Sequence, residues 1–360
     1  MITDIIQSDA DQVVARLGRS LEPLAGTSVL VTGAAGFLGG FFLDVLDAFN
    51  RVHADRPAKV MAMDNMAVGP QARLAHLSAR PWLTLRTGDV ARDEPGGRFD
   101  WIIHCASIGS PSIYRARPLE TIAANVQGTW NMLELARTGA AKGLLSFSSS
   151  EVYGDPQVVP TPEDYHGNVS FTGPRACYDE SKRLGETLCA TYFRLHRVPV
   201  KVIRPFNVYG PGQRLDDGRI IPDLMRAALA GGPLVLFSDG RATRSFCHVA
   251  DFVEACLMLL VMPEADGEAY NVGNAEEVSI ADAARTMAEV AGETPLAVEL
   301  RTPPEAQYLV DNPQRRCPDL TKLHRLTGFT ARIMLREGLA RTLASYREEI
   351  AATRQARRSA

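Results

Sequence analysis

Apolar positions in the first half of the chain follow two alternating spacings. Short runs rich in Val, Ile, Leu and Met are separated by stretches whose apolar residues recur every three or four positions. The first spacing is typical of buried strands and the second of amphipathic helices. The predicted strands are 28–31, 59–63, 83–86, 101–104 and 144–148, and the predicted helices are 37–49 and 119–137. This β-α-β order favours an α/β fold, a doubly wound parallel sheet with helices on both faces.

Beyond Pro205 the regular alternation of strands and helices ends, and the predicted elements are shorter and joined by Gly- and Pro-rich loops. We therefore expect a smaller, mostly C-terminal substrate-binding lobe that closes over the carboxyl edge of the sheet, where ligands of such folds bind. At the other end, apolar residues recur at helical spacing over 2–22 and predict a helix packed on the main domain. The expected units are an N-terminal helical extension (1–25), the nucleotide-binding domain (26–205, with a later return near 243–272), the smaller lobe (206–242 and 273–346) and a basic tail (347–360).

The composition of the chain argues against several classes of protein. The chain of 360 residues has 46% apolar residues and a formal charge of −3, which suits an ordinary globular protein without a broad basic surface for nucleic acid. Its six cysteines form no CxxC pair, so neither a disulfide framework nor a metal site is predicted. The first residues carry acids early and no long apolar run, and the apolar stretch 255–262 is too short to cross a bilayer. These features predict a cytoplasmic protein without a membrane partner.

Three glycines at spacings of three, Gly33, Gly36 and Gly39, lie between the first strand and the first helix of the sheet. The first allows a tight turn, the second lets the backbone approach a pyrophosphate, and the third lets helix and strand pack closely. The helix N-terminus then faces the phosphates. Such a pattern alone is weak, but here it has the required strand–turn–helix context. It predicts a Rossmann-type site for a dinucleotide.

An acid at the end of the second strand indicates which dinucleotide. The carboxylate of Asp64 can accept hydrogen bonds from ribose hydroxyls and would repel a 2′-phosphate, so NAD is favoured over NADP. Asp89 follows the third strand. It either contacts the adenine of the cofactor or is an ordinary aspartate at the end of a strand. The candidate cofactor-binding residues are Gly33, Gly36, Phe37, Leu38, Gly39, Asp64, Asn65, Asp89, Val90, Tyr178 and Lys182.

Tyr178 and Lys182 are four residues apart, which places them on one face of a helix. An ammonium beside a phenol favours the phenolate, so the tyrosine can act as a base near neutral pH. A serine-rich strand end, 146–150, precedes them and offers hydroxyls to a substrate alcohol. A YxxxK pair is common by chance, but together with the glycine turn and the serines it is specific.

These motifs resemble the extended short-chain dehydrogenases/reductases that act on nucleotide sugars, the NAD-dependent epimerase/dehydratase family. The resemblance covers almost all of the chain from about Thr27 to Tyr346. Within the family, the chain is most similar to UDP-glucuronate decarboxylases, the UDP-xylose synthases. The runs that carry this similarity are 148–156, 173–182, 204–211, 217–219 and 315–319.

The resemblance implies roles for the catalytic candidates. Ser149 would hydrogen-bond the sugar C4 hydroxyl, Tyr178 would remove its proton while hydride leaves C4 for NAD, and Lys182 would hold the phenolate and the nicotinamide ribose. A 4-keto uronic acid is a β-keto acid and loses carbon dioxide readily. Glu151 and Arg316 match positions that handle the carboxylate or the proton returned to C5. Hydride then returns to C4, so NAD is recycled and stays bound.

The resemblance also implies a substrate set. An amide and several guanidinium groups suit a nucleotide diphosphate, preferably of a UDP-sugar, because arginine presents a planar fork of donors. Tyr153 and Tyr209, by contrast, are interpreted as packing residues. The candidate substrate-binding residues are Tyr114, Ser150, Asn207, Arg219, Arg244 and Arg316.

The residue before Glu151 separates related chemistries. A 4,6-dehydratase usually has an Asp-Glu pair there, whereas this chain has Ser150-Glu151, the decarboxylase pattern; simple 4-epimerases usually lack the glutamate. The loop 106–118 differs from the proline- and histidine-containing loop that many decarboxylases have at this place. Because that loop borders the sugar, the difference bears on which sugar is bound and not on the oxidation chemistry. The alternatives are therefore a 4-epimerase of a UDP-uronate or UDP-hexose, a dehydratase and, outside enzymes, a non-catalytic NAD-binding regulator. The family pattern also implies a homodimer.

Overall fold

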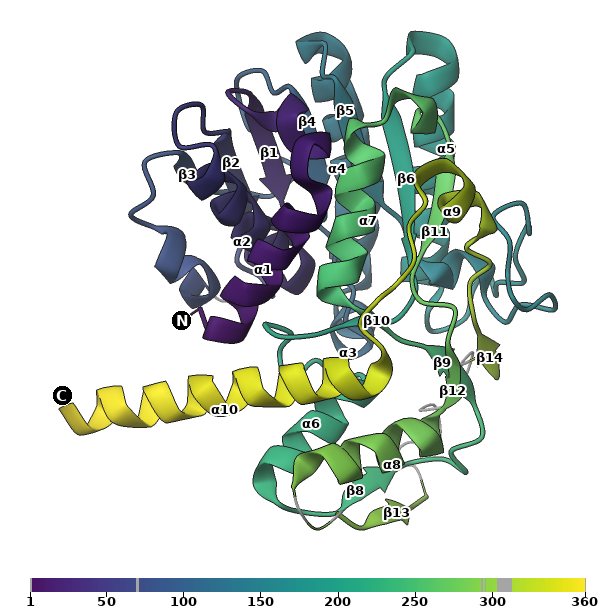
Figure 1. Cartoon of the computed structure of the whole chain (residues 1–360). Helices are drawn as coiled ribbons and strands as arrows, with labels where there is room; N and C mark the ends of the chain where they lie inside the picture. Colours follow the sequence, from purple (N-terminus) through teal and green to yellow (C-terminus); the bar gives the residue numbers. More distant parts are fainter. Residues whose placement is uncertain (1, 69–70, 293, 295, 303–312, 360) are drawn as a thin grey trace.

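The central element of the structure is a seven-stranded, entirely parallel sheet. The computed structural model describes residues 2–68, 71–292, 294, 296–302 and 313–359. The strand order is β11-β6-β5-β4-β1-β2-β3 (Figure 1), which confirms the predicted doubly wound α/β fold. The strands are β1 (Ser28–Thr32), β2 (Lys59–Asp64), β3 (Leu83–Thr87), β4 (Trp101–His104), β5 (Gly143–Phe147), β6 (Val200–Pro205) and β11 (Ala269–Val272).

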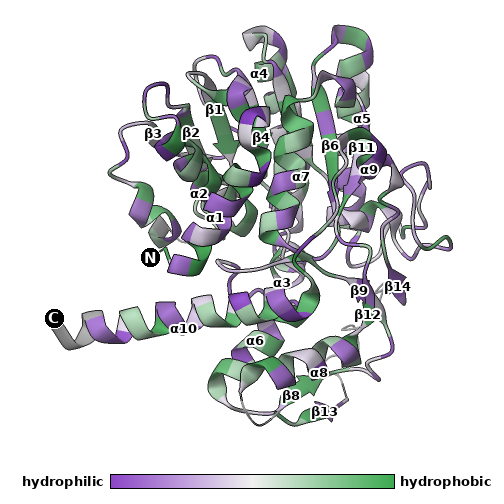
Figure 2. Ribbon diagram, viewed as in Figure 1, coloured by the Kyte–Doolittle hydropathy of each residue, from purple (hydrophilic) through white to green (hydrophobic). Residues whose placement is uncertain are grey.

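Helices cover both faces of this sheet. Within β1, Val29 and Val31 pack into the core formed with one helical layer, whereas Leu30 packs into the core formed with the other. A strand buried on both faces carries an unbroken apolar run, and Figure 2 accordingly shows the strands mostly in green. The first layer contains α1 (Asp4–Leu17), α2 (Phe37–Val52) and α7 (Val249–Val261), and the second contains α4 (Pro118–Gly139) and α5 (Ala176–His196).

The smaller lobe is built from segments that leave the sheet after β6 and again after β11. Its core lies between α6, α8 and α10, with β8 and β13 paired in parallel beside it. Two further small sheets join it to the main domain, β7 with β10 and β12-β9-β14. The elements are β7 (Val208–Tyr209), α6 (Ile220–Ala230), β8 (Leu234–Leu236), β9 (Thr243–Ser245), β10 (Cys247–His248), β12 (Glu277–Ser279), α8 (Ile280–Ala291), β13 (Val298–Leu300), β14 (Arg315–Arg316) and α10 (Leu335–Ser359).

Shorter helices complete the described chain. Two are α-helical, α3 (Pro111–Ala116) and α9 (Thr321–Thr327). Four are 3₁₀ helices, namely η1 (Gly18–Leu24), η2 (Gln71–Leu77), η3 (Ser150–Tyr153) and η4 (Pro263–Ala265). No helix in the described ranges has both the length and the apolar character that crossing a membrane would require.

The N-terminal helix α1 belongs to the core of the molecule. Its residues Ile6, Val13 and Leu17 are buried in the core shared with α2 and α7. Asp9 also accepts a 2.5 Å hydrogen bond from Arg341 of α10, so α1 joins the main domain to the long C-terminal helix. In Figure 1 the end of α10 and the N-terminus lie on the same side of the molecule.

Replacing a buried valine of α1 tests this packing. Val13→Ala should lower the free energy of unfolding by about 2 kcal/mol, because two methyl groups leave a closely packed site. The matched variant is Val52→Ala, where the valine is 69% exposed at the end of α2, and it should change that free energy by less than about 0.5 kcal/mol. Urea unfolding of both variants measures the difference; equal losses would show that α1 is not part of the core.

Candidate active site

A large cleft lies at the carboxyl edge of the sheet, between the main domain and the smaller lobe. Its volume is about 1650 Å³. Pockets for one small ligand usually measure about 300–1,000 Å³, so this cleft has room for two ligands. Every residue that the sequence singled out as catalytic, cofactor-binding or substrate-binding lines this cleft.

The glycine turn after β1 provides an open cradle at one end of the cleft. Gly33 has φ +67°, and a Cβ there would lie 2.7 Å from the backbone nitrogen of Ala106. A Cβ at Gly39 would overlap the carbonyl oxygen of Gly33. Helix α2 then begins at Phe37, and no side chain of the described residues caps its N-terminus. The positive end of this helix is therefore available to an anion in the cleft.

Asp64 joins the end of β2 to this cradle. Its Oδ2 accepts a 2.9 Å hydrogen bond from the backbone N–H of Ala35, and its Oδ1 accepts a 2.7 Å bond from that of Met66. Burial raises the pKa of Asp64, although these two backbone bonds oppose the shift. Each carboxylate oxygen keeps a second lone pair for a ligand hydroxyl. The neighbouring Asn65 is exposed and accepts from the N–H of Ala67.

Asp89 and Val90 line the cleft after β3. The carboxylate of Asp89 accepts a 3.0 Å bond from the N–H of Ala91, and its own N–H donates to Asp93 over 2.7 Å. Val90 is buried in the core beneath α4. Asp89 thus ends its strand in a hydrogen-bonded turn and also lines the cleft. The two interpretations, adenine contact and an ordinary strand end, therefore do not exclude each other.

Tyr178 and Lys182 lie one turn apart on α5, both buried. The Lys182 ammonium donates a 2.6 Å hydrogen bond to the carbonyl oxygen of Phe147 and lies 5.7 Å from the centre of the Tyr178 ring. Ser149 begins η3 by accepting from the N–H of Glu151 over 3.2 Å. Ser149 also shares a hydrogen bond with Tyr178, so the serine, the phenol and the ammonium meet in one place.

Burial acts on the protonation of both groups. It raises the pKa of Tyr178, and the hydrogen bond with Ser149 and the charge of Arg219 oppose this shift. Burial also lowers the pKa of Lys182 to about 8. The ammonium of Lys182 donates to the Phe147 carbonyl, and its expected stabilisation of the phenolate stays a prediction.

Glu151 is held by two arginines from distant parts of the chain. Arg316 of β14 donates to both carboxylate oxygens, over 2.7 and 2.6 Å, and Arg175 at the start of α5 lies 2.6 Å from one of them. Burial alone would raise the pKa of Glu151, but the two guanidinium groups outweigh it and lower the pKa to about 2. Arg244 faces the same cluster, since burial and the charge of Arg316 lower its pKa to about 9.

Arg175 was not among the predicted site residues. It stands three positions before Tyr178 and so, on a helix, on the same face; that spacing is the signal the sequence offered. Only the fold shows that the N-terminus of α5 meets η3, which brings Arg175 to Glu151.

The remaining substrate candidates surround this centre. The ring of Tyr114 stacks on that of Tyr178, with centroids 5.1 Å apart, and its buried hydroxyl makes no hydrogen bond to a described residue. Asn207 donates to the carbonyl oxygen of Ser245 over 3.3 Å, and Arg219 donates to that of Gly109 over 2.7 Å. Ser150 is the first residue of η3 and is buried at the cleft wall.

The two tyrosines interpreted as packing residues are buried. The Tyr153 hydroxyl donates to Asn271 over 2.7 Å and accepts from Arg204 over 2.6 Å. The Tyr209 hydroxyl donates to the carbonyl oxygen of Leu335, which begins α10. Both phenols are thus used in contacts within the chain.

A Rossmann-type sheet with a glycine turn, an acid after the second strand and a Ser-Tyr-Lys group defines the class of nucleotide-dependent dehydrogenases of the short-chain type. The chain belongs to the NAD dependent epimerase/dehydratase family, which matches residues 29–273.

Several known proteins are similar to the chain in sequence or in structure. The chain is 37% identical over 312 residues to UDP-glucuronic acid decarboxylase 5 of Arabidopsis thaliana, covering 86% of each protein. An epimerase of Methanothermobacter thermautotrophicus has a similar structure, with a TM-score of 0.79, 26% identity and 98% of both chains covered. So has a dTDP-glucose 4,6-dehydratase of Streptomyces venezuelae solved with NAD bound, with a TM-score of 0.75, 27% identity and 90% and 98% of the two chains covered.

Removing the Glu151 carboxylate tests the cluster. Glu151→Gln should lower the free energy of unfolding at pH 7 by about 3 kcal/mol, because the guanidiniums of Arg175 and Arg316 lose their shared counter-charge in a largely buried place. A folded pKa of about 2, against an ordinary 4.5, means that this contribution is present above pH 4.5 and is lost as the pH falls toward 2. The difference between variant and native protein should therefore be complete at pH 7 and clearly smaller at pH 3.

The matched control is Glu268→Gln, which removes a mostly exposed partner of Lys322. Its effect should stay below about 1 kcal/mol at both pH values. A loss from Glu151→Gln that is as small as this, or that does not change with pH, would contradict the described role of the ion pairs.

Proposed function

We propose that this protein catalyses the NAD-dependent decarboxylation of UDP-glucuronate to UDP-xylose through a transient 4-keto sugar. One observation carries the proposal: the guanidinium groups of Arg175 and Arg316 hold the Glu151 carboxylate in the same cleft as the Ser-Tyr-Lys group. The buried Nε atoms of both arginines make no hydrogen bond to a described residue, so these groups keep donors for a second carboxylate. An acidic sugar would supply that carboxylate, whereas a neutral hexose would not. The decarboxylases among the relatives support the same substrate.

The residues present fit NAD. The glycine turn and the uncapped start of α2 offer backbone N–H groups to a pyrophosphate, and Asp64 offers lone pairs to ribose hydroxyls. Lys182, on the far side of the cleft, would donate to the second ribose. When bound, NAD would supply reversible hydride transfer at sugar C4.

Tyr178, Ser149 and Lys182 handle the proton of the C4 hydroxyl. Ser149 orients that hydroxyl, and Tyr178 takes its proton as the C4–H bond is broken. Burial raises the pKa of Tyr178, whereas the hydrogen bond with Ser149 and the charge of Arg219 oppose that shift and favour the phenolate.

The arginine cluster handles the sugar carboxylate. Arg316 and Arg175 would share their donors between Glu151 and the carboxylate of C6. Once C4 is a ketone, the C5–C6 bond breaks, carbon dioxide leaves, and the electron pair becomes the enolate of that ketone. Protonation of C5 followed by return of hydride to C4 gives the pentose. Arginine suits this role because it stays charged throughout.

The alternatives differ at named residues. A dehydratase needs an acid beside the base, and Ser150 stands where that acid would be. A hexose 4-epimerase acts on a sugar without a carboxylate, which leaves the donors of Arg175 and Arg316 without a ligand. A uronate 4-epimerase would bind the same acidic sugar, so only the product separates it from a decarboxylase.

The purified protein incubated with UDP-glucuronate should release carbon dioxide and form UDP-xylose without net NADH. Mass spectrometry of the product and absorbance at 340 nm measure both. UDP-galacturonate as the product would contradict decarboxylation and favour the epimerase. The same assay over a panel of UDP-, dTDP-, GDP- and CDP-sugars identifies the nucleotide.

Tyr178→Phe should reduce turnover at least about 100-fold, because the group that moves the proton is lost, while NAD remains bound. NAD released from denatured samples of native and variant protein provides the second readout. Absence of turnover by the native protein with every sugar of the panel, while NAD is bound, would favour a non-catalytic regulator.

We also infer that two copies form a homodimer through α4 and α5. These adjacent helices expose large apolar side chains on the surface turned away from the sheet. On α4 they include Leu119, which is 76% exposed, and Trp130, which is 47% exposed; on α5 they include Leu184 and Leu195. Apolar stripes on two neighbouring helices are suited to a four-helix bundle with a second copy.

Trp130→Asp should convert the dimer to a monomer, because it places a charge in the centre of the apolar surface. Light scattering after gel filtration measures the mass, which should fall from twice to once the chain mass of 39.2 kDa. Leu300→Asp, at an equally exposed leucine of the smaller lobe, should leave the dimer intact. A monomeric native protein would contradict the inference.

A cytoplasmic location is part of the proposal and rests on the cysteines. All six are free thiols, four of them buried. Chains with this many unpaired thiols are typical of reducing compartments.

A further inference from the structure

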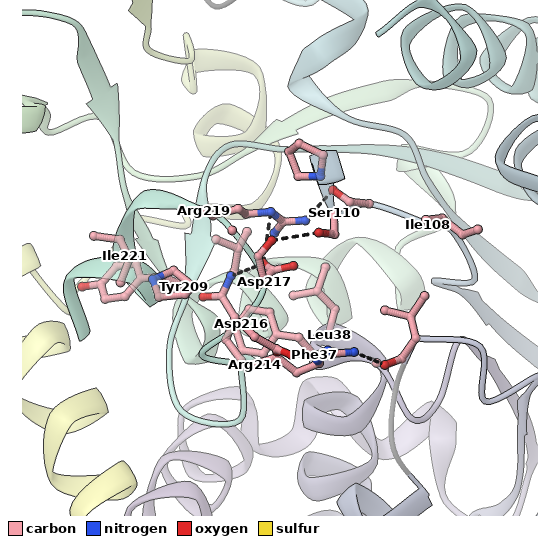
Figure 3. A pocket seen from close by; sticks show the side chains of 18 of the residues that line it. Phe37, Leu38, Ile108, Ser110, Tyr209, Arg214, Asp216, Asp217, Arg219 and Ile221 are labelled. Atoms are coloured by element: carbon pink, nitrogen blue, oxygen red, sulfur yellow. Dashed lines mark hydrogen bonds and ion pairs between the residues drawn. The ribbon is translucent and has the colours of Figure 1, made fainter. Parts of the chain in front are cut away.

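The segment 210–219, between β7 and α6, crosses the mouth of the cleft; we call it the strap. Figure 3 shows its side chains beside Phe37 and Leu38 of the glycine turn. Arg214 donates a hydrogen bond from Nη1 to the carbonyl oxygen of Val68, in the loop after β2. The strap is therefore attached to the main domain and does not only belong to the smaller lobe.

Its other attachment lies on the opposite side of the glycine turn. Ser110 donates to the carbonyl oxygen of Asp217 over 2.8 Å, and Arg219 donates to that of Gly109 over 2.7 Å. Gly109 and Ser110 follow β4. Because β1 lies between β2 and β4 in the sheet, the two attachments flank the turn that follows β1. The strap thus spans the place where the cradle for a dinucleotide lies.

The strap is held together internally and is bounded by two glycines. Arg214 makes a two-point ion pair with Asp216, over 2.8 and 2.6 Å, and Gln213 donates to Asp217 over 3.0 Å. Gly212 and Gly218 flank this unit with φ +86° and +74°, a region that favours glycine. Residues 213–217 therefore form one hydrogen-bonded unit between two positions with the widest choice of backbone angles.

One end is fixed to the rest of the smaller lobe. The Tyr346 hydroxyl of α10 donates to the carbonyl oxygen of Gln213, and both residues are buried. By contrast, the Arg214 side chain is 39% exposed and reaches Val68 by a single donor. The bond to Val68 is thus a single contact, made by a half-exposed side chain, that attaches the strap to the loop after β2, and an opening motion on that side would have to break it.

We propose that the strap closes over bound NAD and that the hydrogen bond from Arg214 to Val68 is its latch, so that Arg214 sets the rate of cofactor exchange. The inference rests on the proposed function, since a redox-neutral cycle must keep the reduced cofactor in place while the keto sugar exists. Arg214 acts here as a positioning residue. It holds the cover closed and takes no part in bond breaking.

Arg214→Met tests the latch, because it keeps the aliphatic stem and removes the donors. Protein loaded with NADH is diluted into excess NAD without any sugar, and the fall in NADH fluorescence gives the release rate. Loss of one charge-assisted hydrogen bond should raise this rate about tenfold. The matched control is Arg241→Met, at an arginine whose side chain is 89% exposed outside the cleft, which should release NADH at the native rate.

Ser110→Ala is a second variant that weakens the attachment on the β4 side and should also speed release. Thermal unfolding without cofactor should give the same midpoint for Arg214→Met and the native protein, which separates opening of the strap from loss of the fold. A native release rate for both Arg214→Met and Ser110→Ala would overturn the proposal.

The assay without sugar keeps this inference separate from the proposed reaction. Faster NADH release by Arg214→Met together with no turnover by the native protein would retain the strap and reject the decarboxylase. Release of NADH at the native rate by both variants, together with formation of UDP-xylose by the native protein, would reject the strap and retain the decarboxylase.

Discussion

The site depends on the ion pairs of Glu151 with Arg316 and Arg175. These three residues come from the turn after β5, from β14 of the smaller lobe and from the start of α5. One carboxylate therefore joins three segments of the chain, two of which are far apart in the sequence. It also separates guanidinium groups that would otherwise repel one another. Because the pKa of Glu151 is about 2, the carboxylate is ionised at neutral pH.

The sheet could be predicted well because its determinants are local. Each predicted strand carries a mostly apolar run, and the structure places a strand at each of these runs, with ends shifted by at most one residue. The glycine turn could also be predicted, because glycines at this fixed spacing between a strand and a helix are typical of a dinucleotide site. Tyr178, Lys182 and Ser149 followed from short motifs within single elements.

Other features of the site depend on the three-dimensional arrangement and could not be predicted. Arg175 and Arg316 are separated by some 140 positions, and only the closure of the lobes brings both to Glu151. The raised pKa of Tyr178 is also a property of the fold, because it depends on burial and on where the Lys182 ammonium points. A spacing of four residues shows that two side chains share a helix face, but not how water is excluded around them.

The packing of α1 has a consequence for how the molecule is synthesised. This helix is made before α7 and α10, its partners in the last third of the sequence. Its apolar side chains, among them Ile6 and Val13, can meet α2 early but cannot be fully covered until α7 has also been made. Contacts between such distant segments slow folding, because a long loop must be closed before they form. The growing chain therefore exposes the apolar face of α1 while the sheet is being synthesised, and exposed faces of this kind favour aggregation.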